Sequence, residues 1–240
     1  MTSSPAMGEI VDLLERPVYG LLQVDRLLGL RSGTARRWID GYKRDGKRYP
    51  PVVRQETTGS DVATWGEFVE TRLLAEYRGA GVPLIKMRPA IDRLRAELET
   101  PYPLASARTW LEIEGQELVR RVQEEVALDK HLALVVVRTG QHVLDWSKPA
   151  DDFRRSVQWS ESNGHDPQPR RLHPMPDIQE VIIDPLRGFG EPVVRGVRTE
   201  IIGELVRAGD SPDMIADLYD LPRHTVDAAV RYEFSRLAAA

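Results

Sequence analysis

The sequence predicts a mainly helical α+β fold with a helix-turn-helix unit near each end and a small β-containing middle. Apolar residues recur at three- and four-residue spacing in both end regions, which is typical of helices packed on a core. An Asp45-Gly46 pair predicts a hairpin after the first unit, and short runs of Val, Ile and Leu predict strands in the middle. The predicted segments are a flexible N-terminus (1–15), a helix-turn-helix with hairpin (16–103), a β-containing middle and linker (104–176) and a three-helix unit (177–240).

The composition is that of a globular protein and argues against several functional classes. Apolar residues make up 41% and charged residues 29% of the 240 residues. The longest apolar run, 132–137, is far shorter than the roughly 20 residues of a membrane-spanning helix, so we expect a cytoplasmic protein without membrane contact or signal peptide. Cysteine is absent, the five histidines lack metal-ligand spacing, and no nucleophile motif occurs. We therefore expect no enzyme activity, no metal site and no cofactor.

The first predicted unit is a pair of short helices joined by a tight turn. An apolar stripe over 24–30 marks the first helix, and Gly29 ends it because glycine tolerates the left-handed backbone of such turns. Ser32 is the expected cap of the second helix, which ends near Gly41. The hairpin predicted from Asp45-Gly46 then covers Lys43–Val53.

Two longer helices complete the segment that ends at residue 103. The spacing of large apolar residues predicts a helix over Val62–Gly79, which Gly79 and Gly81 terminate. A second helix is predicted over Leu84–Leu98, in which Pro89 marks either a kink or the first turn.

Short strands are predicted in the middle of the chain. The predicted strands are 111–113, 118–119 and 134–137, and the predicted hairpin turns are at Gly115 and Gly140. The polar stretch 160–176 indicates a linker or an exposed loop, and a further strand is predicted over 181–183.

The last segment predicts three helices. The first covers Thr199–Ala208, and Ser211-Pro212 supplies a cap and a first-turn proline for the second. The final helix follows Pro222. The side chains of the second helix that are expected to face inward are Met214, Ile215, Leu218 and Tyr219.

Charge is distributed unevenly along the chain. The whole sequence carries −4, but 16–54 holds ten basic and three acidic residues, a net charge of +7 that leaves −11 for the remainder. The stretch 199–240 holds eight acidic and four basic residues, a net charge of −4. A compact basic unit favours contact with a polyanion, whereas an acidic surface repels phosphate and favours protein contact. A solvated basic face is the alternative for 16–54.

The second helix and the hairpin of the first unit carry the side chains that a DNA reader needs. Arg36 and Arg37 lie on that helix, where a guanidinium can make two hydrogen bonds to guanine in the major groove. Cations on the hairpin can follow a phosphate backbone and add affinity without sequence information. Trp38 is expected in the core. The candidate DNA-binding residues are Ser32, Thr34, Arg36, Arg37, Lys43, Arg44, Lys47, Arg48 and Tyr49.

Short motifs between residues 19 and 81 follow the pattern of a known family. They are Leu27-Leu28-Gly29-Leu30, Thr34, Arg36-Arg37-Trp38 and Leu73–Val82 with its Gly79-Ala80-Gly81-Val82 ending. Together they resemble the MerR-type winged helix-turn-helix, which implies a recognition helix, a wing and a homodimer. Leu22 and Asp25 depart from the capping hydroxyl and small residue usual in such domains, and no terminal heptad repeat is present, so a dimer would have to form another way.

The last segment carries a second, more specific set of motifs. They are Pro192–Arg198, Ala208–Pro212, Ile215–Leu221 and Val226–Val230. These motifs resemble a small antitoxin-associated family of unknown function that is common beside PIN-domain toxin genes. With the basic first unit, the chain resembles a VapB-type antitoxin of actinobacteria. The resemblance implies a protein that neutralises a VapC-like PIN-domain ribonuclease toxin and represses its own operon by binding operator DNA.

The resemblance also implies that an arginine of the antitoxin pairs with the metal-binding carboxylates of the toxin. Internal ion pairs are the competing interpretation for every candidate. The candidates are Arg154, Arg155, Arg170, Arg171, Arg187, Arg195 and Arg198. Two other functions remain open: a MerR-like transcriptional regulator that senses a small molecule in the strand-rich middle, and a protein-interaction scaffold whose basic unit is only a surface.

Overall fold

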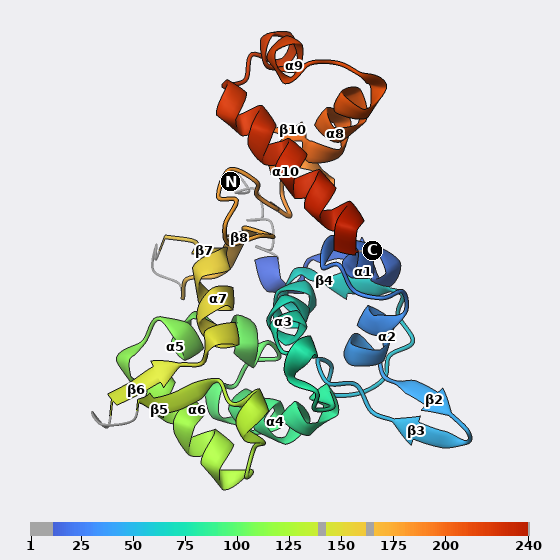
Figure 1. The fold of residues 1–240 in the computed structure, drawn as a ribbon. Coiled ribbons are helices and arrows are strands. Elements are labelled where there is room, and N and C mark those ends of the chain that lie inside the picture. The colour runs from blue at the N-terminus through green and yellow to red at the C-terminus, as the bar shows by residue number, and fades with distance from the viewer. Residues whose placement is uncertain (1–11, 139–142, 162–165, 240) are drawn as a thin grey trace, which may run out of the picture.

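The protein folds as an α+β chain whose side chains form two hydrophobic clusters (Figure 1). The computed structural model describes residues 12–138, 143–161 and 166–239, so most of the predicted flexible N-terminus and the predicted turn at Gly140 lie outside the described residues. The larger cluster, here called the body, draws its core from residues between Leu14 and Ile183. The smaller cluster, the C-terminal module, lies between Ile178 and Tyr232. Packing in the body is continuous across residue 103, where a segment boundary was predicted.

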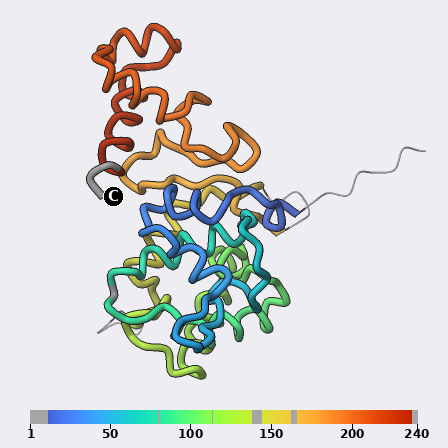
Figure 2. The backbone as a smooth tube through the Cα atoms, turned by 90° about the vertical axis from the view of Figure 1, so that its right-hand side faces the viewer, coloured from blue at the N-terminus to red at the C-terminus, as the bar shows by residue number. Residues whose placement is uncertain are grey.

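The N-terminal part of the body contains the predicted pair of short helices and the hairpin. Its elements are β1 (Pro17–Gly20), α1 (Leu21–Leu27), α2 (Thr34–Ile39), β2 (Tyr42–Arg44), β3 (Lys47–Tyr49), β4 (Val62–Thr64), α3 (Trp65–Glu76) and α4 (Arg88–Leu98). Helix α3 lies at the centre, and every side chain from Trp65 to Leu74 is buried. Helices α2 and α7 pack directly against it, and α4 packs against α6 (Figures 1 and 2).

The predicted helix over 62–79 begins three residues later than expected. Thr64 is its N-cap: its hydroxyl accepts a hydrogen bond from the backbone N–H of Glu67 at 3.2 Å. The Glu67 carboxylate accepts one in return from the backbone N–H of Thr64 at 2.9 Å. This reciprocal cap ends the strand β4, which pairs antiparallel with β1. The predicted helix over 84–98 begins with a 3₁₀ turn, and Pro89 lies in the first turn of α4 rather than at a kink.

The middle of the chain is more helical than predicted. Its elements are α5 (Ala107–Trp110), α6 (Ile113–Glu125), β5 (Val135–Arg138), β6 (Val143–Trp146), α7 (Lys148–Ser156), β7 (Val157–Trp159) and β8 (Pro169–Leu172). The strands predicted at 111–113 and 118–119 are wrong, because 111–112 form the turn between α5 and α6, and 113 and 118–119 lie in α6. Val119 and Val122 are buried three residues apart, the spacing of one helix face. Gly115 lies inside α6 rather than in a turn. Glycine is required there, because a Cβ would lie 2.3 Å from the carbonyl oxygen of Arg108.

Two further expectations for the middle are corrected. The stretch predicted as a linker, 160–176, contains β8, which pairs antiparallel with β7. The predicted strand over 181–183 forms only isolated bridges, from Ile183 to Leu172 and from Ile182 to Val193. These bridges connect the body to the C-terminal module, which a flexible linker would not do.

The C-terminal module has the three predicted helices and a small hairpin before them. Its elements are β9 (Val193–Val194), β10 (Val197–Arg198), α8 (Thr199–Ala208), α9 (Pro212–Tyr219) and α10 (Arg223–Ala239). Ser211 caps α9 as predicted, because its hydroxyl accepts from the backbone N–H of Met214 at 3.3 Å. The inward orientation predicted for Met214 and Leu218 is wrong: 62% and 69% of these residues are exposed, whereas Ile215 is buried.

The C-terminal module rests on α1 of the body. The buried hydroxyl of Tyr19 donates to the carbonyl oxygen of Gly190 at 2.7 Å. Glu191 accepts from Gln23 and from the guanidinium of Arg26, both at 2.6 Å. A Cβ at Gly190 would lie 2.5 Å from the Tyr19 hydroxyl oxygen, so this contact requires glycine.

Candidate nucleic-acid interface

Helix α2 presents its arginines because its other face is anchored in the body. Ala35 and Ile39, four residues apart, are fully buried. Arg36 and Arg37 therefore point outward, and both are exposed.

The cap of α2 is a carboxylate from α1, not the predicted hydroxyl of Ser32. Buried Asp25 accepts from the backbone N–H of Gly33 and of Ala35, each at 2.7 Å. Gly33 itself adopts a left-handed backbone at φ 78° and occupies the cap position. Ser32 is exposed, so its hydroxyl is left for other contacts. The carboxylate of Asp25 thus fixes the angle between α1 and α2.

Each of the two arginines of α2 makes a single polar contact with the protein in the described residues. The guanidinium of Arg36 forms an ion pair with Asp61, and both side chains are exposed, at 46% and 76%. Arg37 donates to the hydroxyl of Thr34 at 2.9 Å. Thr34 is itself nearly buried, so it supports Arg37 more readily than it reaches a ligand. An exposed ion pair of this kind contributes little stability and can open to a phosphate or a base.

The hairpin β2–β3 projects from the body next to α2 (Figure 1). Asp45 and Gly46, both with positive φ, form its turn, as predicted. Tyr42 and Tyr49 are opposite each other and stack with ring centroids 4.6 Å apart. The ammonium of Lys47 lies 5.3 Å from the centre of the Tyr49 ring.

The cations of this hairpin, called the wing here, face one another in two cross-strand pairs. Lys43 is directly opposite Arg48, and Arg44 is directly opposite Lys47. All four are exposed, and the sole ion pair among them within the described residues joins Arg44 to its neighbour Asp45 at 3.4 Å. Like charges placed directly opposite destabilise a hairpin. A polyanion would relieve that repulsion, which a neutral partner or water cannot do as well.

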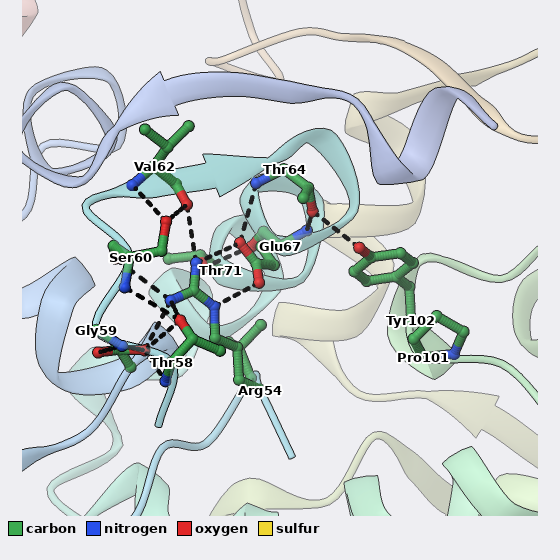
Figure 3. A network of polar contacts seen from close by, with 12 residues as sticks. Arg54, Thr58, Gly59, Ser60, Val62, Thr64, Glu67, Thr71, Pro101 and Tyr102 are labelled. Atoms are coloured by element: carbon green, nitrogen blue, oxygen red, sulfur yellow. Dashed lines mark hydrogen bonds and ion pairs between the residues drawn. The ribbon is translucent and has the colours of Figure 1, made fainter. Parts of the chain in front are cut away.

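One cation of the predicted basic unit is structural. The side chain of Arg54 is only 9% exposed and lies between Asp40 and Glu67, with N–O distances of 2.7 and 2.6 Å (Figure 3). Burial alone would raise the pKa of Asp40, but hydrogen bonds from Thr58, Arg54 and Gly59 outweigh it and lower that pKa. This network holds the loop after the wing against α3. Nothing local in the sequence indicates it, because the partners lie 13 and 14 residues away.

A hollow of about 350 Å³ lies beside α2. Gly20, Leu22, Gly33, Arg36 and Asp61 are among its lining residues. Leu22 is 69% exposed there. Another hollow lies near α9. Neither hollow is lined by residues of the middle segment, where a small-molecule site was considered. In that segment Trp110 packs against Trp146 and Phe153, with ring centroids 4.6 and 5.1 Å apart.

Most of the arginines considered for toxin contact form internal ion pairs. Arg170 and Arg171 both pair with Asp184, whose side chain is fully buried. Arg154 and Arg155 pair with Asp151, three and four residues before them and about one turn back on α7. Three candidates are exposed and have no ion pair within the described residues: Arg187, Arg195 and Arg198. In the same part of the chain, no group of three His, Asp or Glu side chains could hold a metal ion, and no helix is both long and apolar enough to span a membrane.

Two family profiles match the chain, one at each end. Residues 17–91 match a family described as "Putative DNA-binding HTH domain". This match covers α1, α2 and the wing, so the N-terminal unit is similar to a helix-turn-helix family whose description names DNA binding. Residues 181–232 match "Protein of unknown function (DUF433)", which corresponds to the C-terminal module.

Relatives from Mycobacterium tuberculosis match nearly the whole chain. "Uncharacterized protein Rv2308" is 35% identical over 96% of this chain and 98% of its own length. "Putative antitoxin VapB45" is 31% identical over 88% of this chain and 93% of its own length. The crystal structure of Rv2018 from the same organism has a TM-score of 0.70 at 25% identity, and the likeness covers 91% of this chain and all of that one. The chain therefore belongs to the family that contains Rv2308 and the protein named VapB45.

Proposed function

We propose that the chain is an antitoxin that represses its own operon and neutralises a PIN-domain ribonuclease toxin. It binds operator DNA through α2 and the wing, and it holds the toxin through its acidic C-terminal module. The protein acts as a binding partner and carries out no catalysis itself.

The wing is the observation that carries the DNA-binding half. Its four exposed cations stand in two directly opposed pairs on a hairpin that buries no apolar face. The arrangement is unfavourable in isolation and becomes favourable along a phosphate backbone, where each cation releases condensed counterions. Helix α2 lies beside the wing with Arg36 and Arg37 outward, which suits it for the major groove.

The antitoxin half is supported by family membership and by charge. One relative across most of the chain bears the name of an antitoxin, and the C-terminal module carries −4 between residues 199 and 240. A negative surface is repelled by DNA and attracts a cationic protein surface. The two activities are thus assigned to different ends of one chain.

The DNA-binding half is tested with the DNA upstream of the chain's own reading frame. Labelled duplex is titrated with the unchanged chain and with an Arg36→Ala/Arg37→Ala variant, and fluorescence anisotropy gives each Kd. A base-reading arginine contributes about 1–3 kcal/mol of discrimination, so the variant should lose most of its preference for this duplex over a scrambled one. Equal preference in the variant and the unchanged chain would refute the assignment of α2.

The antitoxin half is tested with the protein encoded by the reading frame adjacent to that of the chain, which the proposal expects to be a PIN-domain toxin. The unchanged chain should co-purify with it and abolish its cleavage of RNA. A purified toxin that stays fully active in an excess of the chain would refute the proposed neutralisation, whatever the result with DNA.

A further inference from the structure

Helix α9 exposes an apolar face that the described part of the chain leaves uncovered. Met214 and Leu218 are four residues apart and therefore on one side of the helix, with 62% and 69% of each residue exposed. Ile215, the residue after Met214, is buried in the C-terminal module. Helix α9 is held on the module by buried Ile215 and by partly buried Ala216 and Tyr219, so we expect the fold to tolerate changes at the two exposed side chains.

These side chains line a hollow with an acidic rim. The hollow has a volume of about 480 Å³, and its lining includes Asp210, Asp217 and Ile215 beside the two exposed apolar residues. Asp213, on the same helix, pairs with Arg223. Asp210 and Asp217 have no ion-pair partner among the described residues, so the charge at the rim is uncompensated.

The surface lies at the end of the molecule opposite the wing. Helix α9 is at the top of Figure 1 and the wing near the bottom, and the view in Figure 2 also places the C-terminal module above the body. A partner docked on α9 would therefore leave α2 and the wing open to DNA.

We propose that the hollow on α9 docks the toxin, through an apolar side chain of the toxin flanked by Lys or Arg. This inference rests on the proposed antitoxin function and specifies its contact surface. Burial of Met214 and Leu218 under an apolar side chain of the toxin would stabilise the complex. The uncompensated carboxylates of Asp210 and Asp217 favour cationic side chains of the toxin around that contact. DNA is disfavoured by the same carboxylates. A symmetric contact with a second copy would place this acidic rim against itself, so self-association through this face is disfavoured as well.

The test compares two leucines that are equally exposed at opposite ends of the chain. Leu218→Ser removes an apolar contact from the hollow on α9, and Leu22→Ser removes one beside α2, each from a position that is 69% exposed. The full-length chain is mixed with the toxin expected from the adjacent reading frame, and isothermal titration calorimetry gives Kd. Leu218→Ser combined with Met214→Ser should weaken toxin binding at least about tenfold, while Leu22→Ser leaves it unchanged.

A charge variant tests the rim independently. Asp210→Lys/Asp217→Lys should weaken toxin binding by a comparable factor, and this loss should shrink as NaCl is raised. Circular dichroism and thermal melting of each variant confirm that the exposed substitutions leave the fold intact.

The remaining results of these experiments each contradict a different proposal. If the unchanged chain binds and inhibits the toxin but the α9 variants bind equally well, the docking surface is wrong while the antitoxin function stands. If the unchanged chain does not bind the toxin, both proposals fail. If analytical ultracentrifugation shows that the α9 variants lose a dimer present in the unchanged chain, the occupant is a second copy and the inference is overturned.

Discussion

Neutralising the wing should lower DNA affinity in a way that depends on salt. The perturbation is the simultaneous replacement of Lys43, Arg44, Lys47 and Arg48 by alanine. Each phosphate contact contributes about 0.9 to the slope of log K against log salt, so loss of all four should reduce the slope by about 3.6. Between 50 and 200 mM NaCl the unchanged chain should then lose about 150-fold more affinity than the variant. The hairpin should remain folded, because removal of two like-charge pairs relieves repulsion and the Tyr42 stack is retained.

The assay is fluorescence anisotropy of a labelled duplex at several NaCl concentrations. The control is Arg195→Ala/Arg198→Ala, which removes two exposed cations of the C-terminal module and should leave the slope unchanged. A quadruple variant whose slope equals that of the unchanged chain would refute the role of the wing, even if its affinity at one salt concentration were lower.

Three further outcomes follow from described contacts. Asp25→Ala removes an acceptor for two backbone N–H groups and should lower the free energy of unfolding by about 2–4 kcal/mol in urea titrations, whereas Ser32→Ala should leave it nearly unchanged. Asp61→Asn should free Arg36 and increase affinity for DNA of any sequence by a few-fold, measured by anisotropy on scrambled duplex; a decrease would mean that Asp61 orients the arginine. Burial raises the pKa of Glu70 to about 8, so the folded chain binds a proton that the unfolded chain releases above about pH 4.5. Stability should therefore fall as the pH rises from about 4.5 to 8, and Glu70→Gln should abolish this dependence in melts between pH 5 and 9.

The sequence predicted elements whose signals are local. The turn at Asp45-Gly46 and the start of α9 at Ser211-Pro212 were predicted correctly, although the strands of the hairpin end at Tyr49 and not at Val53. The exposure of the wing cations follows from the same local pattern, because a hairpin of four cations flanked by two tyrosines has no apolar face to bury. Contact of these residues with DNA stays a prediction.

Features that depend on distant residues could not be predicted. The cap of α2 comes from Asp25, eight and ten residues before the groups it binds, whereas Ser32 is the local candidate. Arg54 was counted with the basic surface, although Asp40 and Glu67 enclose it in the fold. The short apolar groups at 111–119 fit a strand and a helix equally well, and contact between α5 and α6 decides for the helix. Met214 and Leu218 follow the spacing of a buried face, but no element of the described chain covers them.

Helix α1 serves both ends of the molecule. Asp25 of α1 caps α2 and orients it, and Gln23 and Arg26 of α1 donate hydrogen bonds to Glu191 of the C-terminal module. Truncation of the chain before residue 177 would remove the C-terminal module from α1, and the Tyr19 hydroxyl would lose its acceptor, the carbonyl oxygen of Gly190. The N-terminal unit and the C-terminal module are therefore joined through α1 and β1, and binding studies should use the full-length chain rather than the N-terminal unit alone.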